Sequence, residues 1–163
     1  MTISPNCMDE TDPNALTVDQ ALRRILERCE PVAGSESVGL NDALDRILAT
    51  AVTARLDVPP ARNSAMDGYA LSGNEGQAGT RLRIAGVSAA GHPWEGTLKA
   101  GECVRILTGA VVPETADTVV MQERVTVRDG IITLEADCAP GSNVRHPGED
   151  TRAGTEILSR GRR

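Results

Sequence analysis

The sequence is almost devoid of aromatic residues: its 163 residues include no phenylalanine, one tyrosine and one tryptophan. Apolar residues still make up 40% of the chain, so a core has to be built from Val, Ile, Leu and Ala. A core of this kind is typical of small β-barrels and sandwiches. Proteins that bind single-stranded nucleic acids usually stack the bases on aromatic rings, so the shortage argues against a nucleic-acid partner.

The sequence also lacks a basic cluster and a long apolar run. Its 17 basic residues are outnumbered by 23 acidic ones, for a net charge of −6, and they are scattered where phosphate binding needs them clustered. No apolar run approaches the length of a membrane span, and the polar, acidic residues 1–14 are unlike a signal peptide. We therefore expect a cytoplasmic protein with no membrane partner and with a disordered leader at residues 1–14.

Signatures of structural metals and disulfides are absent as well. The four cysteines stand far apart, no Cys-x-x-Cys pair occurs, and there are only two histidines. This spacing predicts neither a zinc site nor a disulfide framework, and it favours reduced thiols.

One clear helix signal and one weaker signal occur near the N-terminus. Apolar residues recur at the spacing of one helical face at Val18, Ala21, Leu22, Ile25, Leu26 and Cys29. Thr17 and Gln20 have the spacing of a capping box, and Pro31 marks the expected end of this helix. Asn41 is a suitable N-cap for a second helix that extends to about Leu48.

A different pattern extends from about residue 57 to residue 137. Short apolar runs, several of them alternating with a period of two, are separated by Gly, Pro and Asp, which indicates a compact all-β unit. Asp129 and Gly130 lie between two such runs and predict a tight hairpin. The chain stops just as a new apolar stretch begins at Ile157, so we expect it to be part of a longer protein.

These patterns together predict a mixed α+β fold. Residues 15–55, together with residues 150–163, are expected to form an incomplete α/β segment that includes the N-terminal helix. Residues 56–149 are expected to form a small, barrel-like all-β domain that is inserted into this segment.

Two stretches combine a turn with a side chain suited to chemistry. In residues 58–71, two prolines stiffen the approach to Asp67, and the following glycine allows a tight turn that presents its carboxylate. Thr108 and Gly109 directly follow an apolar strand, where a hydroxyl and a flexible backbone are suited to holding an anion. Taken singly, both stretches are more simply explained as turns.

A third stretch, residues 143–154, crowds acidic and basic side chains around a Pro-Gly turn. One interpretation is a surface ion-pair network of little energetic weight. The functional interpretation is a mixed site in which Arg145 faces an anionic substrate and Asp150 faces a hard cation such as Mg²⁺. Taken alone, this stretch also favours the simpler explanation.

The order and separation of the three stretches carry more weight than any one of them. The successive motifs NSAMDGYA, GECVRILTGA and NVRHPGED closely resemble the N-terminal half of the molybdopterin molybdenumtransferase family, which includes MoeA and the E domain of gephyrin. The resemblance extends from about Leu16 to the end of the chain. The sequence departs from the family pattern at Ala61, Arg62, Leu107, Val111, Thr115 and His146. The first two departures are expected to alter the charge near Asp67.

The resemblance implies a Mg²⁺-dependent enzyme that inserts molybdate into adenylylated molybdopterin and releases AMP. It implies catalytic roles for Asp67, Thr108 and Asp150, of which the two aspartates also bind the metal. The residues implied to bind substrate are Ser64, Gly109, Arg145 and Glu149. The family's larger molybdopterin-binding domain and its C-terminal β-domain are absent from this sequence. We therefore expect this chain to supply part of a site and to be inactive alone, within a full-length homodimer that contacts other cofactor-assembly proteins.

A second hypothesis is that a short protein uses this scaffold only for binding, as a partner or regulator of cofactor assembly. It predicts that replacing Asp67 or Asp150 leaves partner binding intact. A third hypothesis, a small nucleic-acid-binding barrel, is disfavoured by the charge balance and by the lack of aromatic residues.

Overall fold

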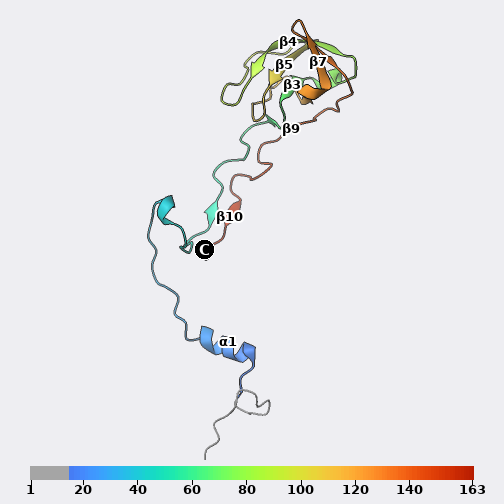
Figure 1. Cartoon of the computed structure of the whole chain (residues 1–163). Helices are drawn as coiled ribbons and strands as arrows, with labels where there is room; N and C mark the ends of the chain where they lie inside the picture. Colours follow the sequence, from blue (N-terminus) through green and yellow to red (C-terminus); the bar gives the residue numbers. More distant parts are fainter. Residues whose placement is uncertain (1–14) are drawn as a thin grey trace, which may run out of the picture. The chain divides into compact units, whose positions relative to one another are not determined.

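The computed structural model describes residues 15–163, so the leader expected at residues 1–14 lies outside the described part. The chain divides into two compact units, one ending at Asp45 and the other comprising Arg46–Arg163. The first unit holds the helix α1 (Val18–Leu26) and the short 3-10 helix η1 (Leu40–Asp42), and the second holds the ten strands of the described chain (Figure 1). No helix within residues 15–163 is both long enough and apolar enough to cross a membrane.

The helix α1 confirms the first helix prediction but ends earlier than expected. The amide of Gln20 donates to Oγ1 of Thr17 at 3.2 Å, and the amide of Thr17 donates to Oε1 of Gln20 at 3.0 Å, which completes the predicted capping box. The last helical residue is Leu26, well before Pro31. Because α1 buries none of its residues, packing does not stabilise a further turn, and short helices without such packing are marginal in water.

The second helix, predicted from Asn41 to Leu48, does not form, and that prediction was wrong. Only the single turn of η1 is present, and the φ of 66° at Asp45 interrupts any continuation. Leu44 is 83% exposed, so burial of apolar surface does not offset the cost of nucleating a short helix.

The predicted all-β region forms one curled sheet of six strands, in the order β6-β3-β5-β4-β8-β7. Its strands are β3 (Gly68–Leu71), β4 (Arg81–Ser88), β5 (Glu102–Ile106), β6 (Thr118–Met121), β7 (Val125–Arg128) and β8 (Ile131–Leu134). Every pair of neighbours is antiparallel except β4 and β5, which are parallel. Two short 3-10 helices accompany the sheet, η2 (Gly73–Glu75) and η3 (Gln122–Arg124).

The hairpin predicted at Asp129 and Gly130 is confirmed. Both residues have a positive φ, 49° and 74°, and the flanking residues Arg128 and Ile131 face each other in the β7–β8 ladder. A two-residue loop with two positive φ angles matches the right-handed twist of the strands that it joins.

The core has two parts because side chains alternate across the sheet. Along β3, Tyr69 and Leu71 pack into one cluster with Cys103, whereas Ala70 packs into the other with Val104. The second cluster is completed by buried side chains from the segment that follows β5: Ala110, Val112 and Ala116. Burial on both faces explains why β3 is apolar along its whole length.

Two further strand pairs lie outside the six-stranded sheet. β2 (Asn63–Ser64) pairs with β9 (Val144–Arg145), and β1 (Val52–Thr53) pairs with β10 (Glu156–Leu158). The second pair joins residues from both parts of the predicted α/β segment. The assignment of residues 15–55 and 150–163 to one segment, with residues 56–149 inserted, stays a prediction.

Gly68 is required for a different reason from the one that the sequence indicated. It is the first residue of β3, and a Cβ atom at this position would lie 2.0 Å from the carbonyl oxygen of Val120. Close approach of the β6 backbone, rather than turn geometry, therefore demands glycine here.

We expect Gly68→Ala to lower the free energy of unfolding by about 3 kcal/mol, because the clashing partner is backbone and cannot rotate away. Gly91→Ala is the matched control: its φ is 77° and no atom lies within 4 Å of the added Cβ, so only about 1 kcal/mol of strain is expected. Urea unfolding of both variants tests the difference. Equal losses would contradict the packing argument.

Cys103 is expected to be chemically silent in the native protein. Burial first, and then the carboxylates of Glu75 and Glu102, raise the pKa of the Cys103 thiol to about 12. Because the thiolate is the reactive form, iodoacetamide at pH 8 should label exposed Cys29 rapidly and Cys103 only after unfolding. Peptide mass spectrometry over time measures both rates, and similar rates in the native protein would show that the prediction is wrong.

Candidate functional site

The short strand β2 joins the three stretches that the sequence singled out. On one side, the amide of Ser64 donates to the carbonyl of Ala110 at 2.9 Å, and the amide of Gly109 donates to the carbonyl of Ser64 at 2.8 Å. On the other side, β2 pairs with β9, so that Asn63 lies opposite Arg145. Main-chain hydrogen bonds therefore hold all three stretches around two residues.

The carboxylate of Asp67 is bound by Thr108. Its Oδ1 accepts from the Thr108 amide at 2.8 Å and from the Thr108 hydroxyl at 2.7 Å. The hydrogen bond from the Thr108 main-chain amide is the largest cause that lowers the pKa of Asp67, and the hydrogen bond from the Thr108 hydroxyl is the next. Partial burial opposes this lowering, and the charge of Arg105 adds to it. Asp67 is thus ionised at neutral pH, and its Oδ2 accepts no hydrogen bond from residues 15–163.

Gly109 and Ser64 use their polar groups within the chain. The φ of Gly109 is 79°, and its amide is directed to the Ser64 carbonyl. The Ser64 side chain is buried, donates to the Met66 carbonyl at 2.5 Å and accepts from the Met66 amide at 3.3 Å. Both residues therefore shape the turn that leads to Asp67, and their contacts with substrate stay predictions.

Arg145, Glu149 and Asp150 form the second cluster. The guanidinium of Arg145 pairs with Asp150 through Nη2, and its Nε lies 3.5 Å from Oε1 of Glu149. The other carboxylate oxygen of Glu149 accepts from the His146 amide at 2.9 Å. The hydrogen bond with Asp150 is the main cause that raises the pKa of Arg145. Because all three charged side chains are partly exposed, the pairs add little stability.

The two carboxylates that were predicted to bind the metal have different partners: Asp67 is bonded to Thr108, and Asp150 to Arg145. Within residues 15–163, His, Cys, Asp and Glu side chains nowhere gather in threes as a metal site. Mg²⁺ often keeps several waters and uses one or two protein carboxylates plus oxygens of a phosphate substrate. Asp67, with an open Oδ2, fits that kind of coordination.

The side chain of Arg62 has partners other than Asp67, near which the sequence led us to expect its charge. The guanidinium donates to three main-chain carbonyls, those of Pro113 at 3.3 Å, Glu114 at 3.4 Å and Ala116 at 3.1 Å. It makes no hydrogen bond or ion pair with Asp67. Arg62 therefore fastens the segment that covers the second core cluster.

Sequence reasoning missed Arg105 and Gln122. Arg105 donates to the Gly68 carbonyl at 2.9 Å and to Oε1 of Gln122 at 2.6 Å, directly behind the turn that carries Asp67. The only signal in the sequence was the position of Arg105 within the GECVRILTGA motif, where it reads as a polar residue of an alternating strand.

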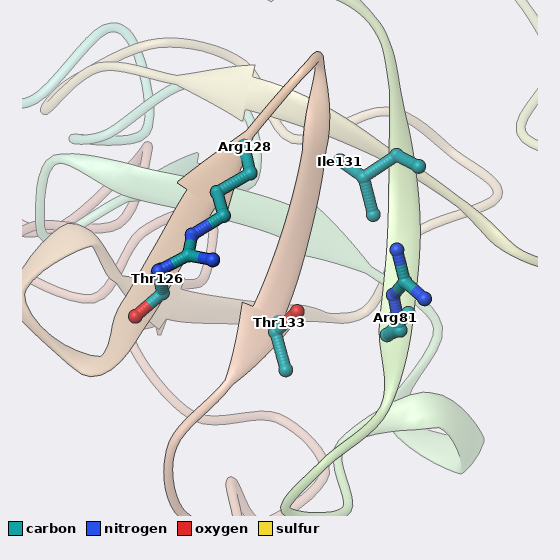
Figure 2. A pocket seen from close by; sticks show the side chains of 5 residues that line it. All are labelled: Arg81, Thr126, Arg128, Ile131 and Thr133. Atoms are coloured by element: carbon teal, nitrogen blue, oxygen red, sulfur yellow. The ribbon is translucent and has the colours of Figure 1, made fainter.

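A shallow hollow of about 300 Å³ lies apart from these residues, on strands β4, β7 and β8. Figure 2 shows its lining: Arg81, Thr126, Arg128, Ile131 and Thr133. It contains none of the site residues that the sequence predicted.

The sheet and its loops form a small β domain that brings an ionised carboxylate, a hydroxyl and a paired arginine together from three separate stretches of the sequence. The family model for the MoeA N-terminal region (domain I and II) matches residues 16–163, and the chain belongs to this family. The resemblance predicted from the three motifs is thereby confirmed.

Similar proteins extend well beyond this chain. The molybdopterin molybdenumtransferase of Haemophilus influenzae is 40% identical over 147 residues, which cover 90% of this chain and 36% of that protein. Gephyrin of Dictyostelium discoideum is 32% identical, over 91% of this chain and 23% of that protein. The crystal structure of a MoeA protein from Pyrococcus horikoshii aligns with a TM-score of 0.81 and 30% identity, covering 87% and 39% of the two chains. The chain thus spans about a third of the length of most of these relatives.

Removing the Thr108 hydroxyl tests its effect on Asp67. Because that hydroxyl lowers the pKa of Asp67, Thr108→Val should raise the pKa. The rise should be only part of the way to the ordinary value, since the hydrogen bond from the main-chain amide is the larger cause and remains. Thr108→Ser keeps the donor and should leave the pKa unchanged. Titration of the Asp67 carboxyl carbon by ¹³C NMR measures this, and an unchanged pKa in Thr108→Val would refute the assignment.

Proposed function

We propose that this chain supplies part of the active site of a molybdenum-inserting transferase in the biosynthesis of molybdenum cofactor. Family membership and the names of the relatives support the proposal. The observation that carries it is the meeting of the three motifs around β2, because motifs separated in sequence share one neighbourhood. In the proposed reaction, molybdate is inserted into adenylylated molybdopterin and AMP is released.

Asp67 is the proposed catalytic carboxylate, and Thr108 is its partner. The two hydrogen bonds from Thr108 keep the carboxylate ionised and fix Oδ1, which leaves Oδ2 for a ligand. A negative group next to anionic substrates needs a compensating cation, so we assign Asp67 and Asp150 to Mg²⁺ together with phosphate oxygens of the substrate.

Arg145 is the proposed anion-binding residue. In the structure its charge is compensated by Asp150 and Glu149, so an anionic substrate has to compete with both carboxylates. If the guanidinium of Arg145 turned from Asp150 to an oxyanion, Asp150 would lose its cationic partner, and bound Mg²⁺ would replace that positive charge. This exchange gives the ion-pair cluster a function that its small contribution to stability does not explain.

The remaining parts of the protein are proposed from its relatives. Because the chain spans only part of their length, we propose that the full-length protein adds a molybdopterin-binding domain and assembles as a cytoplasmic homodimer. Within it, residues 56–149 would be a β domain inserted into an α/β segment. Because the isolated chain lacks these parts of the site, we expect it to be inactive on its own.

An AMP-release assay tests the proposal. The purified chain with adenylylated molybdopterin, molybdate and Mg²⁺ should release no AMP, and adding the missing domains should restore release. In the restored assay, Asp67→Asn and Asp150→Asn should each lower kcat by about 100-fold or more, and EDTA should abolish the activity. Arg81→Gln, in the hollow of Figure 2, is the charge-changing control and should act like the wild type.

Two outcomes would overturn the proposal in different ways. AMP release by the isolated chain would show that it holds a whole site. Full activity of Asp67→Asn and Asp150→Asn in the restored assay would remove the assigned roles and favour a module that only binds.

A further inference from the structure

Arg105 stands at the centre of a ring of contacts behind Asp67. Its Nη1 donates to the Gly68 carbonyl at 2.9 Å, and its Nη2 donates to Oε1 of Gln122 at 2.6 Å. The main-chain amide of Gln122 in turn donates to the main-chain carbonyl of Asp67 at 3.1 Å. The ring runs from Asp67 through Gly68, Arg105 and Gln122 back to Asp67.

The chemistry of this position requires arginine. Arg105 lies directly across from Tyr69 in the β3–β5 ladder, and its guanidinium carbon is 5.1 Å from the centre of the Tyr69 ring. A planar guanidinium can stack on a ring while donating to two acceptors in its plane, whereas a lysine ammonium has no such fork. The single tyrosine of the chain is therefore part of the support for this group.

The ring fixes the backbone on both sides of the Asp67–Gly68 peptide. The carbonyl of Asp67 is held by the Gln122 amide, and the carbonyl of Gly68 is held by Arg105. Thr108 follows β5, the same strand that carries Arg105. β5 and the residues directly after it therefore provide both the group that holds the turn and the group that binds its carboxylate.

We infer that Arg105 is a positioning residue: through Gly68 and Gln122 it holds the turn that aligns the Asp67 carboxylate with Thr108. The inference rests on the proposed function only in giving Asp67 a role in the reaction. The alignment itself is a property of this chain, so it can be tested without substrate.

NMR spectroscopy of the Thr108 amide tests the alignment. In Arg105→Lys, which keeps the charge but loses the fork, and in Gln122→Ala, which opens the ring at an exposed residue, we expect Thr108 amide exchange to accelerate at least 10-fold. The coupling across the hydrogen bond between the Thr108 nitrogen and the Asp67 carboxylate should vanish. Arg83→Lys is the matched control, because Arg83 pairs with Glu102 and should leave both signals unchanged.

The core amide of Val104 separates positioning from global stability, since Val104 is fully buried in β5. Its exchange should stay within 2-fold of wild type in both variants. An unchanged Thr108 signal in both variants would overturn the inference, and so would equal acceleration at Val104 and Thr108. If Arg105→Lys fails to fold, Gln122→Ala decides alone.

The restored AMP-release assay supplies the functional readout. Arg105→Lys should lower kcat at least 10-fold while KM stays within 2-fold, because misalignment of Asp67 affects the chemical step more than substrate binding. A wild-type kcat, despite a displaced Thr108 signal, would remove the catalytic importance of the alignment. A wild-type assay without activity would defeat the proposed function and leave the NMR result standing.

Discussion

The main chain of Asn63 and Ser64 is hydrogen-bonded on both sides, and the arrangement of the candidate site depends on that double bonding. One side is bonded to the segment after β5 and the other to β9. A two-residue strand has few side-chain contacts with which to fix its neighbours, so backbone hydrogen bonds determine the register. If either ladder were lost, the carboxylate of Asp67 and the cluster around Arg145 would no longer have a fixed separation.

The two aspartates of the candidate site have different hydrogen-bond partners. Asp67 receives hydrogen bonds from a neutral amide and a neutral hydroxyl, so it keeps its full negative charge. Asp150 is paired with a guanidinium, and the pair is close to neutral. The negative charge of Asp67 is therefore uncompensated by its hydrogen-bond partner, whereas that of Asp150 is compensated by Arg145. The proposed roles in Mg²⁺ binding and in anion binding come from the family resemblance, and this contrast says which charges a ligand would meet.

The backbone next to Asp67 is contacted by close packing and by hydrogen bonds from outside the turn itself. Gly68 allows the backbone of β6 to approach, and Arg105 then bridges to the end of that strand through Gln122. The neighbouring core is mostly aliphatic on both faces of β3, with Tyr69 buried in one cluster and Trp94 packed against the other. The Tyr69 ring lies against the guanidinium of Arg105, so one of the two aromatic side chains of the chain supports this group.

Local sequence determined the features whose causes lie within a few residues. The capping box at Thr17, the hairpin at Asp129 and the alternating strands could all be predicted, since their hydrogen bonds and turn angles are short-range. The order of the three motifs also identified the family. Tertiary structure alone decided the parallel pairing of β4 with β5, the failure of the helix after Asn41, and the partners of Arg62 and Arg105. Each depends on whether residues far apart in the chain make contact or, for the failed helix, make none, and propensity and periodicity carry no information about such contacts.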